Sequence, residues 1–397
     1  MATTNSDNQN TSPAQAGTKR SGELFEYPPK KKVGVTDPVV HAGRHFGRTV
    51  NSVIPTRTLI TNGLRRMVKL KLEKIPLEDF PKKEQREHEI FVTLLDMVPG
   101  LINRLITASD EEAIHISDML QKGVNKARAD DTKGLKTSII DWISRGEVLI
   151  PTLFRNNKSD RGFNHPRTGE LLCPAAWNWN DEAVKKSLRS GERKIPGEQW
   201  PAFVYEDYRY DSTNPWRGLF RSTLLVTAYK FVFTSPSSAD GEIKATRSGN
   251  ARIHGMTEIT LPSIAYVATL VRFSLSSQTT FSRSNCVTDS ERFYNTIMDL
   301  FSEVRELGEI NDLAAWWNLQ VFPGATSQDH DSIDEDAPLA MIRKRRDNLE
   351  RLAALATTTR PAEHEEVGNS EHRRDVQSSS SATNQAGAEG SGASSSS

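Results

Sequence analysis

The sequence has few of the features that mark several protein classes. Two cysteines, Cys173 and Cys286, are too few in 397 residues for a disulfide scaffold or a thiolate zinc cage. No stretch approaches the roughly 18 consecutive apolar residues of a membrane helix. The polar N-terminal segment also lacks the apolar centre of a signal peptide. We therefore expect a soluble, intracellular protein with no membrane partner.

An excess of one charge sign is also missing. There are 51 Lys and Arg against 51 Asp and Glu, which argues against a uniformly basic nucleic-acid coat. Hydrophobic residues make up 36% of the chain, below the roughly 45–50% (with glycine) of compact domains. Part of the chain should therefore remain unfolded. We expect a disordered arm at 1–45, a helix-rich globular region at 46–325, an acidic linker at 326–337, a short basic amphipathic helix at 338–356 and a disordered Ser-rich tail at 357–397.

Helix signals dominate the globular region. Residues 82–97 follow Pro81, place apolar side chains on one face and stop before Pro99. The sequence Ser109-Asp110-Glu111-Glu112 is a capping box that predicts a helix to about Gly123. We predict a mainly α fold, or α+β with a few short strands. Further helices are expected at 135–143, from Asn214-Pro215 through 234, from Pro262 to 275, from the Thr288–Glu291 capping box to 307 and at 313–322, with strand candidates at 147–154 and 201–208.

Two basic clusters in the N-terminal arm resemble a nuclear-import signal. Lys19 and Arg20 are followed, after nine residues that end in Pro28-Pro29, by Lys30, Lys31 and Lys32. Prolines keep such a segment extended, which suits the acidic groove of an import receptor. The alternative is a solvated run of charge. We expect a nuclear protein, with the cytoplasm as the alternative, and an import receptor as partner.

The segment between Val39 and Leu72 contains no Asp or Glu. It carries a local excess of positive charge that suits phosphate groups of DNA or RNA, or an acidic partner. The alternative is an amphipathic element that packs on the core and leaves its charges in water. Seven basic residues lie here, Arg44, Arg48, Arg57, Arg65, Arg66, Lys69 and Lys71, and the last five are the candidate phosphate contacts.

Two further segments combine arginine, histidine and turn-forming residues. Their guanidinium groups and backbone amides would suit a phosphate or carboxylate. The alternatives are a surface loop whose arginines bind nearby carbonyls, and a polar connection between helices. The candidate anion-binding residues are Arg155, Lys158, Arg161, His165 and Arg167 in the first segment, and Arg247, Ser248, Asn250, Arg252 and His254 in the second.

The sequence lacks several known catalytic motifs. The sequence has no G-x-S-x-G, no H-E-x-x-H and no phosphate-binding loop of the Walker type. Cys173, between Leu172 and Pro174, is interpreted as a small buried residue. We therefore predict no catalytic residue, no metal and no cofactor.

Five sequence blocks occur together in order: SDRGFNHPRTGELLCPA at 159–175, ATRSGNARIHGMT at 245–257, IAYVATLVRFSLSS at 264–277, VTDSERFYNTIMDL at 287–300 and WWNLQVFP at 316–323. Through them the chain resembles a family of uncharacterised proteins that is numerous in mushroom-forming basidiomycete fungi. The resemblance covers roughly residues 50–325. It implies a fungal protein from a multi-member group, and it brings no reaction, ligand or site residue.

Three functions remain as hypotheses. The first is a nuclear binding protein that contacts nucleic acid or chromatin through the basic segment. The second is a protein-interaction or scaffold module that uses Leu349, Leu352 and Leu355 beside the basic run at 343–346. The third is an unrecognised phosphate-handling enzyme, which requires the two Arg/His segments to converge on one site.

Overall fold

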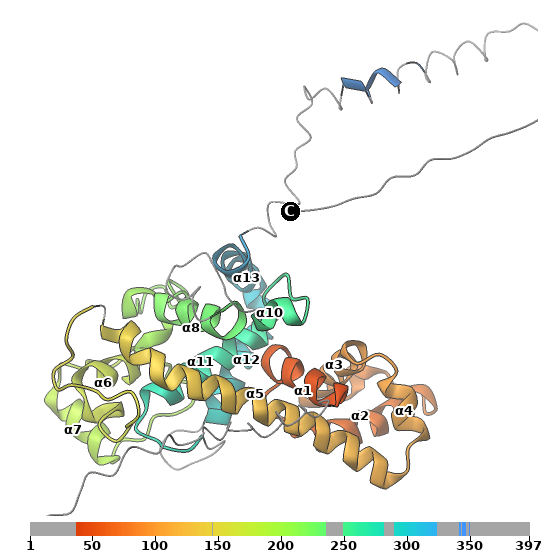
Figure 1. Ribbon diagram of the computed structural model, residues 1–397, viewed down its shortest axis with the longest axis horizontal. Coiled ribbons are helices and arrows are strands. Elements are labelled where there is room, and N and C mark those ends of the chain that lie inside the picture. The colour runs from red at the N-terminus through yellow and green to blue at the C-terminus, as the bar shows by residue number, and fades with distance from the viewer. Residues whose placement is uncertain are drawn as a thin grey trace, which may run out of the picture. The chain divides into compact units, whose positions relative to one another are not determined.

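The longest helix, α5 (Asp110–Ser144), runs through the fold (Figure 1). At 1.5 Å per residue it is about 52 Å long. Its N-terminus is capped as the sequence predicted, because the amide of Glu112 donates to Ser109 Oγ at 3.3 Å. Acidic residues in the first turn also stabilise the positive end of the helix.

The computed structural model of the chain describes residues 37–144, 146–235, 249–281 and 290–323. It also describes residues 341, 342, 344–346 and 349, which belong to a separate unit that begins at Asp331. These few residues are helical, and Met341, Ile342 and Leu349 are exposed. The basic clusters at 19–20 and 30–32, the linker at 326–337 and the tail at 357–397 lie outside the described residues.

Four helices pack around the first half of α5. They are α1 (Pro38–Thr49), α2 (Thr56–Lys71), α3 (Lys82–Met97) and α4 (Leu101–Thr107). Prolines punctuate them, and Asp37 caps α1 by accepting from the Val39 amide at 2.8 Å. The N-terminal core, as we call this cluster, is built on Phe46, Leu59, Phe91 and Leu120.

The second half of α5 belongs to a larger core. Its central helix is α11 (Leu261–Leu275), whose residues are buried from Ser263 to Leu275. A helix buried on all sides has to be largely apolar, and α11 is, although it also buries Arg272. Around it lie α6 (Pro166–Leu172), α7 (Glu182–Ser190), α8 (Thr223–Phe233), α10 (Asn250–Ile253), α12 (Ser290–Phe301) and α13 (Leu307–Val321).

The mainly α prediction is confirmed, and the described residues contain no strand. The helix predicted at 82–97 has these bounds, and α11 begins beside Pro262 as expected. α1 begins at Pro38, inside the segment 1–45 that was expected to be a disordered arm. No single described helix is long and apolar enough to cross a membrane; α3 and α4 pass that test only as a pair, bent by 105°.

Several local predictions were wrong. No helix starts at Asn214, because the left-handed residues Gly218 and Phe220 interrupt it and α8 starts only after Ser222. The segment 201–208 forms 3-10 turns with single bridges, and 147–154 forms no strand. The helix from the second capping box ends at Phe301, so Val304 and Leu307 are exposed.

Gly123 does not end a helix; it lets α1 cross α5 at close range. A Cβ atom at Gly123 would lie 2.3 Å from the Val40 carbonyl oxygen. A Cβ atom at Gly43 would lie 2.3 Å from the Leu120 carbonyl oxygen. Because both obstacles are backbone atoms, no side-chain rotation can relieve them. The crossing therefore depends on glycine at both positions.

Replacing Gly123 by alanine should lower the free energy of unfolding by about 2–3 kcal/mol, because the methyl group pushes two backbones apart. Urea denaturation followed by circular dichroism measures this. Gly308→Ala is the matched control, since nothing lies within 4 Å of its Cβ position. That change should be neutral or stabilise by up to about 1 kcal/mol. Equal stability of Gly123→Ala and wild type would contradict the close crossing.

Candidate functional site

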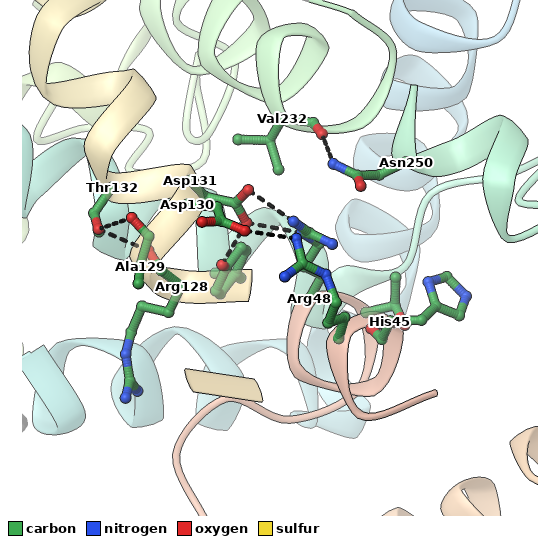
Figure 2. Close-up of polar contacts among 12 residues, drawn as sticks. His45, Arg48, Arg128, Ala129, Asp130, Asp131, Thr132, Val232 and Asn250 are labelled. Carbon is green, nitrogen blue, oxygen red and sulfur yellow. Dashed lines mark hydrogen bonds and ion pairs between the residues drawn. The ribbon is translucent and has the colours of Figure 1, made fainter. Parts of the chain in front are cut away.

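A buried ion pair joins three helices beside the crossing of α1 and α5. Arg48 donates from Nε to Asp131 Oδ2 and from Nη2 to Oδ1, both at 2.8 Å (Figure 2). The Arg48 and Asp131 side chains are 1% and 7% exposed. Tyr266 of α11 adds a third bond, from its hydroxyl to Asp131 Oδ2 at 2.7 Å. Each carboxylate oxygen is thus hydrogen-bonded, as a buried charge requires.

The protonation states in this network are fixed by burial and charge. Burial opposes the charged form of Arg48, but hydrogen bonding and the charge of Asp131 outweigh it and raise the Arg48 pKa. Burial and the Asp131 carboxylate raise the pKa of Tyr266 well above its usual value. Tyr266 therefore stays protonated and remains a donor. This chemistry is structural, since every reactive atom of the carboxylate is already engaged.

A second, exposed ion pair lies next to the buried one. Arg44 Nη2 is 2.9 Å from Asp130 Oδ2, with side chains 25% and 65% exposed. Asp130, Asp131 and Tyr266 were not among the residues predicted from the sequence. The sequence held one indication of these ion pairs: Arg44 and Arg48 lie one helical turn apart. Because their segment has no acidic residue, carboxylates that pair with them have to come from another part of the chain.

Three histidines cluster beside Arg48 at α1. The His254 ring, at the end of α10, lies 4.4 Å from the His41 ring and 4.3 Å from the His45 ring, measured between centroids. It stacks on His45 with 5° between the planes. Burial, followed by the charges of Arg48 and His41, lowers the pKa of His45 to about 4. Burial, followed by His45, His41, Arg48 and Arg44, lowers that of His254 to about 3.

These two imidazoles are therefore neutral at pH 7. Neutral imidazole is the form that binds metals, but stacked rings do not direct their nitrogens to a common point. Within the described residues no group of three or more His, Cys, Asp or Glu side chains is arranged to hold a metal ion. The cluster is thus a contact between helices.

The five candidate phosphate contacts of α2 divide into two kinds. Arg66 is buried and points inward, with Nη2 3.2 Å from Glu87 and Nη1 3.8 Å from Glu84, both on α3. The other four, Arg57, Arg65, Lys69 and Lys71, are exposed. Among the described residues no ion pair involves them. We call these four the α2 cationic face.

The first Arg/His segment is tied to backbone carbonyls. Arg161 donates to four of them, those of Lys136, Ser274, Phe154 and Arg155, and is fully buried. Lys158 Nζ donates at 2.6 Å to the carbonyls of Phe273 and Gln278, at the C-terminal end of α11. Burial, then the charges of Arg161 and Lys136, lowers the Lys158 pKa to about 7. Both cations therefore face the negative end of a helix.

The remaining residues of this segment also have internal partners. His165 caps α6, because its Nδ1 accepts from the Arg167 amide at 3.0 Å while Nε2 lies 2.7 Å from the Pro151 carbonyl. Arg167 binds Glu170 and the Ile143 carbonyl. Arg155 pairs with Asp141 at the surface. Cys173 is buried, and burial raises its pKa to about 11, which disfavours the nucleophilic thiolate.

The second segment is placed elsewhere on the molecule. Arg247 and Ser248 lie outside the described residues, Asn250 donates to the Val232 carbonyl, and Arg252 is exposed. His254 contacts His41 and His45 on α1, whereas Arg161 and Arg167 of the first segment bind the carbonyls of Lys136 and Ile143 on α5. The described residues of the two segments therefore have different contact partners.

Comparison with known proteins identifies a family without an assigned activity. Residues 122–322 match the model described as a family of unknown function (DUF6698), and the chain belongs to this family. No curated protein and no solved structure matches. The resemblance to an uncharacterised family is thereby confirmed, and the fungal origin stays a prediction. The match begins within α5, so α1–α4 precede it.

A double-mutant cycle tests the buried pair. Arg48→Met and Asp131→Asn should each destabilise the protein by about 3–5 kcal/mol, since each leaves a buried group without its partner. The double variant should be clearly more stable than the sum of the two losses predicts. Chemical denaturation measures all three.

The exposed pair supplies the control for this cycle. Arg44→Met and Asp130→Asn should cost at most about 1 kcal/mol each, with little coupling. Additive effects at Arg48 and Asp131 would show that their contact does not contribute to stability as the geometry implies.

Proposed function

We propose that the protein binds nucleic acid through the α2 cationic face, without strong sequence preference. The observation that carries the proposal is the arrangement of Arg57, Arg65, Lys69 and Lys71 on one exposed helix that has no acidic residue. Cations that are not neutralised by neighbouring carboxylates are available to replace the counterions of a phosphate backbone.

The spacing of these side chains suits a duplex. Arg57 and Lys69 are about 18 Å apart along α2, the axial length of roughly five successive phosphates on one strand. The exposed apolar residues beside them, Val68 and Leu72, are aliphatic. Binding of single strands usually requires aromatic side chains on which bases stack. The side chains of α2 therefore favour binding of a duplex through its phosphates, without recognition of the bases.

Arg66 has a positioning role in this proposal. Its ion pairs with Glu84 and Glu87 hold α2 against α3, and Asn62 Nδ2 also donates to Glu87 Oε1 at 2.8 Å. These contacts turn the neighbouring Arg65 outward. Removing Arg66 would disturb the helix itself, so it is unsuitable as a probe of phosphate contact.

Replacing the four residues of the cationic face by alanine should weaken binding to a 20-base-pair duplex by at least tenfold at 50 mM salt. The slope of log affinity against log salt should become shallower by about 3 to 4, at roughly 0.9 per phosphate contact. Fluorescence anisotropy over a salt series measures both. Duplexes of different sequence should lose affinity about equally.

A charge-matched variant separates this face from net charge. It replaces four exposed cations elsewhere, namely Lys133, Lys186, Lys194 and Arg209. This variant should keep the wild-type slope. Equal losses in both variants, or no duplex binding by the wild-type chain at low salt, would overturn the proposal and favour an acidic or apolar protein partner.

A protein partner remains the second candidate. Met341, Ile342 and Leu349 are 54%, 64% and 58% exposed beside the exposed cations Lys344, Arg345 and Arg346. Exposed apolar side chains at helical spacing favour docking to another protein. The phosphate-handling enzyme is not proposed, because the described residues of its two segments have different contact partners: His254 contacts α1, whereas Arg167 binds α5.

We also propose that an import receptor carries the protein into the nucleus by means of Lys19, Arg20, Lys30, Lys31 and Lys32. A fluorescent fusion of the full chain should accumulate in nuclei. Changing Lys30, Lys31 and Lys32 to alanine should reduce the nuclear-to-cytoplasmic ratio several-fold. The same change at Lys344, Arg345 and Arg346 should have a smaller effect. Unchanged distribution in the first variant would contradict this role.

A further inference from the structure

The contact between His254 and the two histidines of α1 connects the N-terminal core with the larger core. His41 and His45 lie one turn apart on α1, which belongs to the N-terminal core through Val39 and Phe46. His254 follows α10, whose Ala251 belongs to the larger core. The His254 ring contacts both α1 rings.

Among the described residues, no acidic side chain acts on His254, and the two carboxylates beside α1 are already paired. The charged and titratable groups that act on His254 are His45, His41, Arg48 and Arg44, all from α1. The carboxylates nearest to these arginines, Asp130 and Asp131, are already paired with them. From α8, the Val232 carbonyl accepts a hydrogen bond from Asn250 at the start of α10.

α10 itself has few other attachments. It is four residues long, and the amides of Ile253, His254, Gly255 and Met256 close its only turn and cap. Gly249 touches the backbone of Thr234. A single helical turn is unstable alone, so α10 depends on its contacts with α1 and α8.

We propose that the cluster of His41, His45 and His254 is a latch that holds α10 on α1 at neutral pH and releases it in acid. Protonation would place positive charges on rings that are in contact, next to two arginines. Their repulsion would separate α10 from α1 while the buried Arg48 and Asp131 pair keeps α1 on α5. The latch is independent of nucleic-acid binding by α2.

The direction of the pH dependence follows from proton linkage. The pKa values of His45 and His254 in the closed state, about 4 and about 3, lie below the usual 6.5. The closed state therefore binds fewer protons than the open state between pH 6.5 and 4. Closure should be fully stable above pH 6.5 and should weaken progressively as the pH falls through that interval.

Hydrogen exchange on the full chain tests the latch. Protection of the amides of residues 253–256, corrected for the intrinsic pH dependence of exchange, should fall at least tenfold between pH 7 and pH 5. His254→Phe and His45→Phe, whose rings stack without titrating, should each reduce this fall, and the double variant should reduce it to less than threefold. His115→Asn, at an exposed position of α5, should behave as wild type.

Two results would overturn the latch. One is constant protection in the wild-type chain from pH 7 to pH 5. The other is an equal fall in both phenylalanine variants, which would locate the acid sensitivity elsewhere. If the variants do not fold, NMR titration of the wild-type His254 ring decides: an apparent pKa below 5 supports the latch, and one near 6.5 refutes it.

Discussion

The close crossing of α1 and α5 is the constraint on which the rest of the structure depends. Glycines at 43 and 123 bring the two backbones together, and Arg48 can then reach Asp131. The same carboxylate binds Tyr266, so the position of α11 is linked to that of α1. Because a buried charge without its partner is costly, these contacts stabilise one mutual arrangement of the three helices.

Basic residues in this chain have two different roles: the buried ones make internal contacts, and the exposed ones are accessible to a ligand. Arg161 and Lys158 end helices by binding their last carbonyls, and Arg66 holds α2 against α3. Arg65, its neighbour in sequence, is exposed and carries no ion pair within the described residues. A count of basic residues therefore overstates the charge that a ligand can use. Four of the seven in the basic segment remain accessible on α2.

The sequence predicted those features that depend on local chemistry. The bounds of α3 and the start of α11 follow from proline positions, and the start of α5 follows from the Ser109 cap. Gly123 was misread as a stop, because a glycine that permits close packing looks the same in sequence as one that ends a helix. The histidine stack and the Arg48–Asp131 pair join distant residues and leave no local periodicity.

The first residue of the family match does not coincide with the boundary of a helix or of a hydrophobic core. The match begins at residue 122, inside α5 and inside the N-terminal core, between Leu120 and Val124. A fragment that began there would keep Asp131 and Tyr266 but lose Arg48, and it would expose the face of α5 that α1 covers. Such a fragment would expose apolar side chains of the N-terminal core to water and would leave Asp131 without its counterion. The folded unit that contains the matched region therefore has to include α1, and with it the histidines that contact α10.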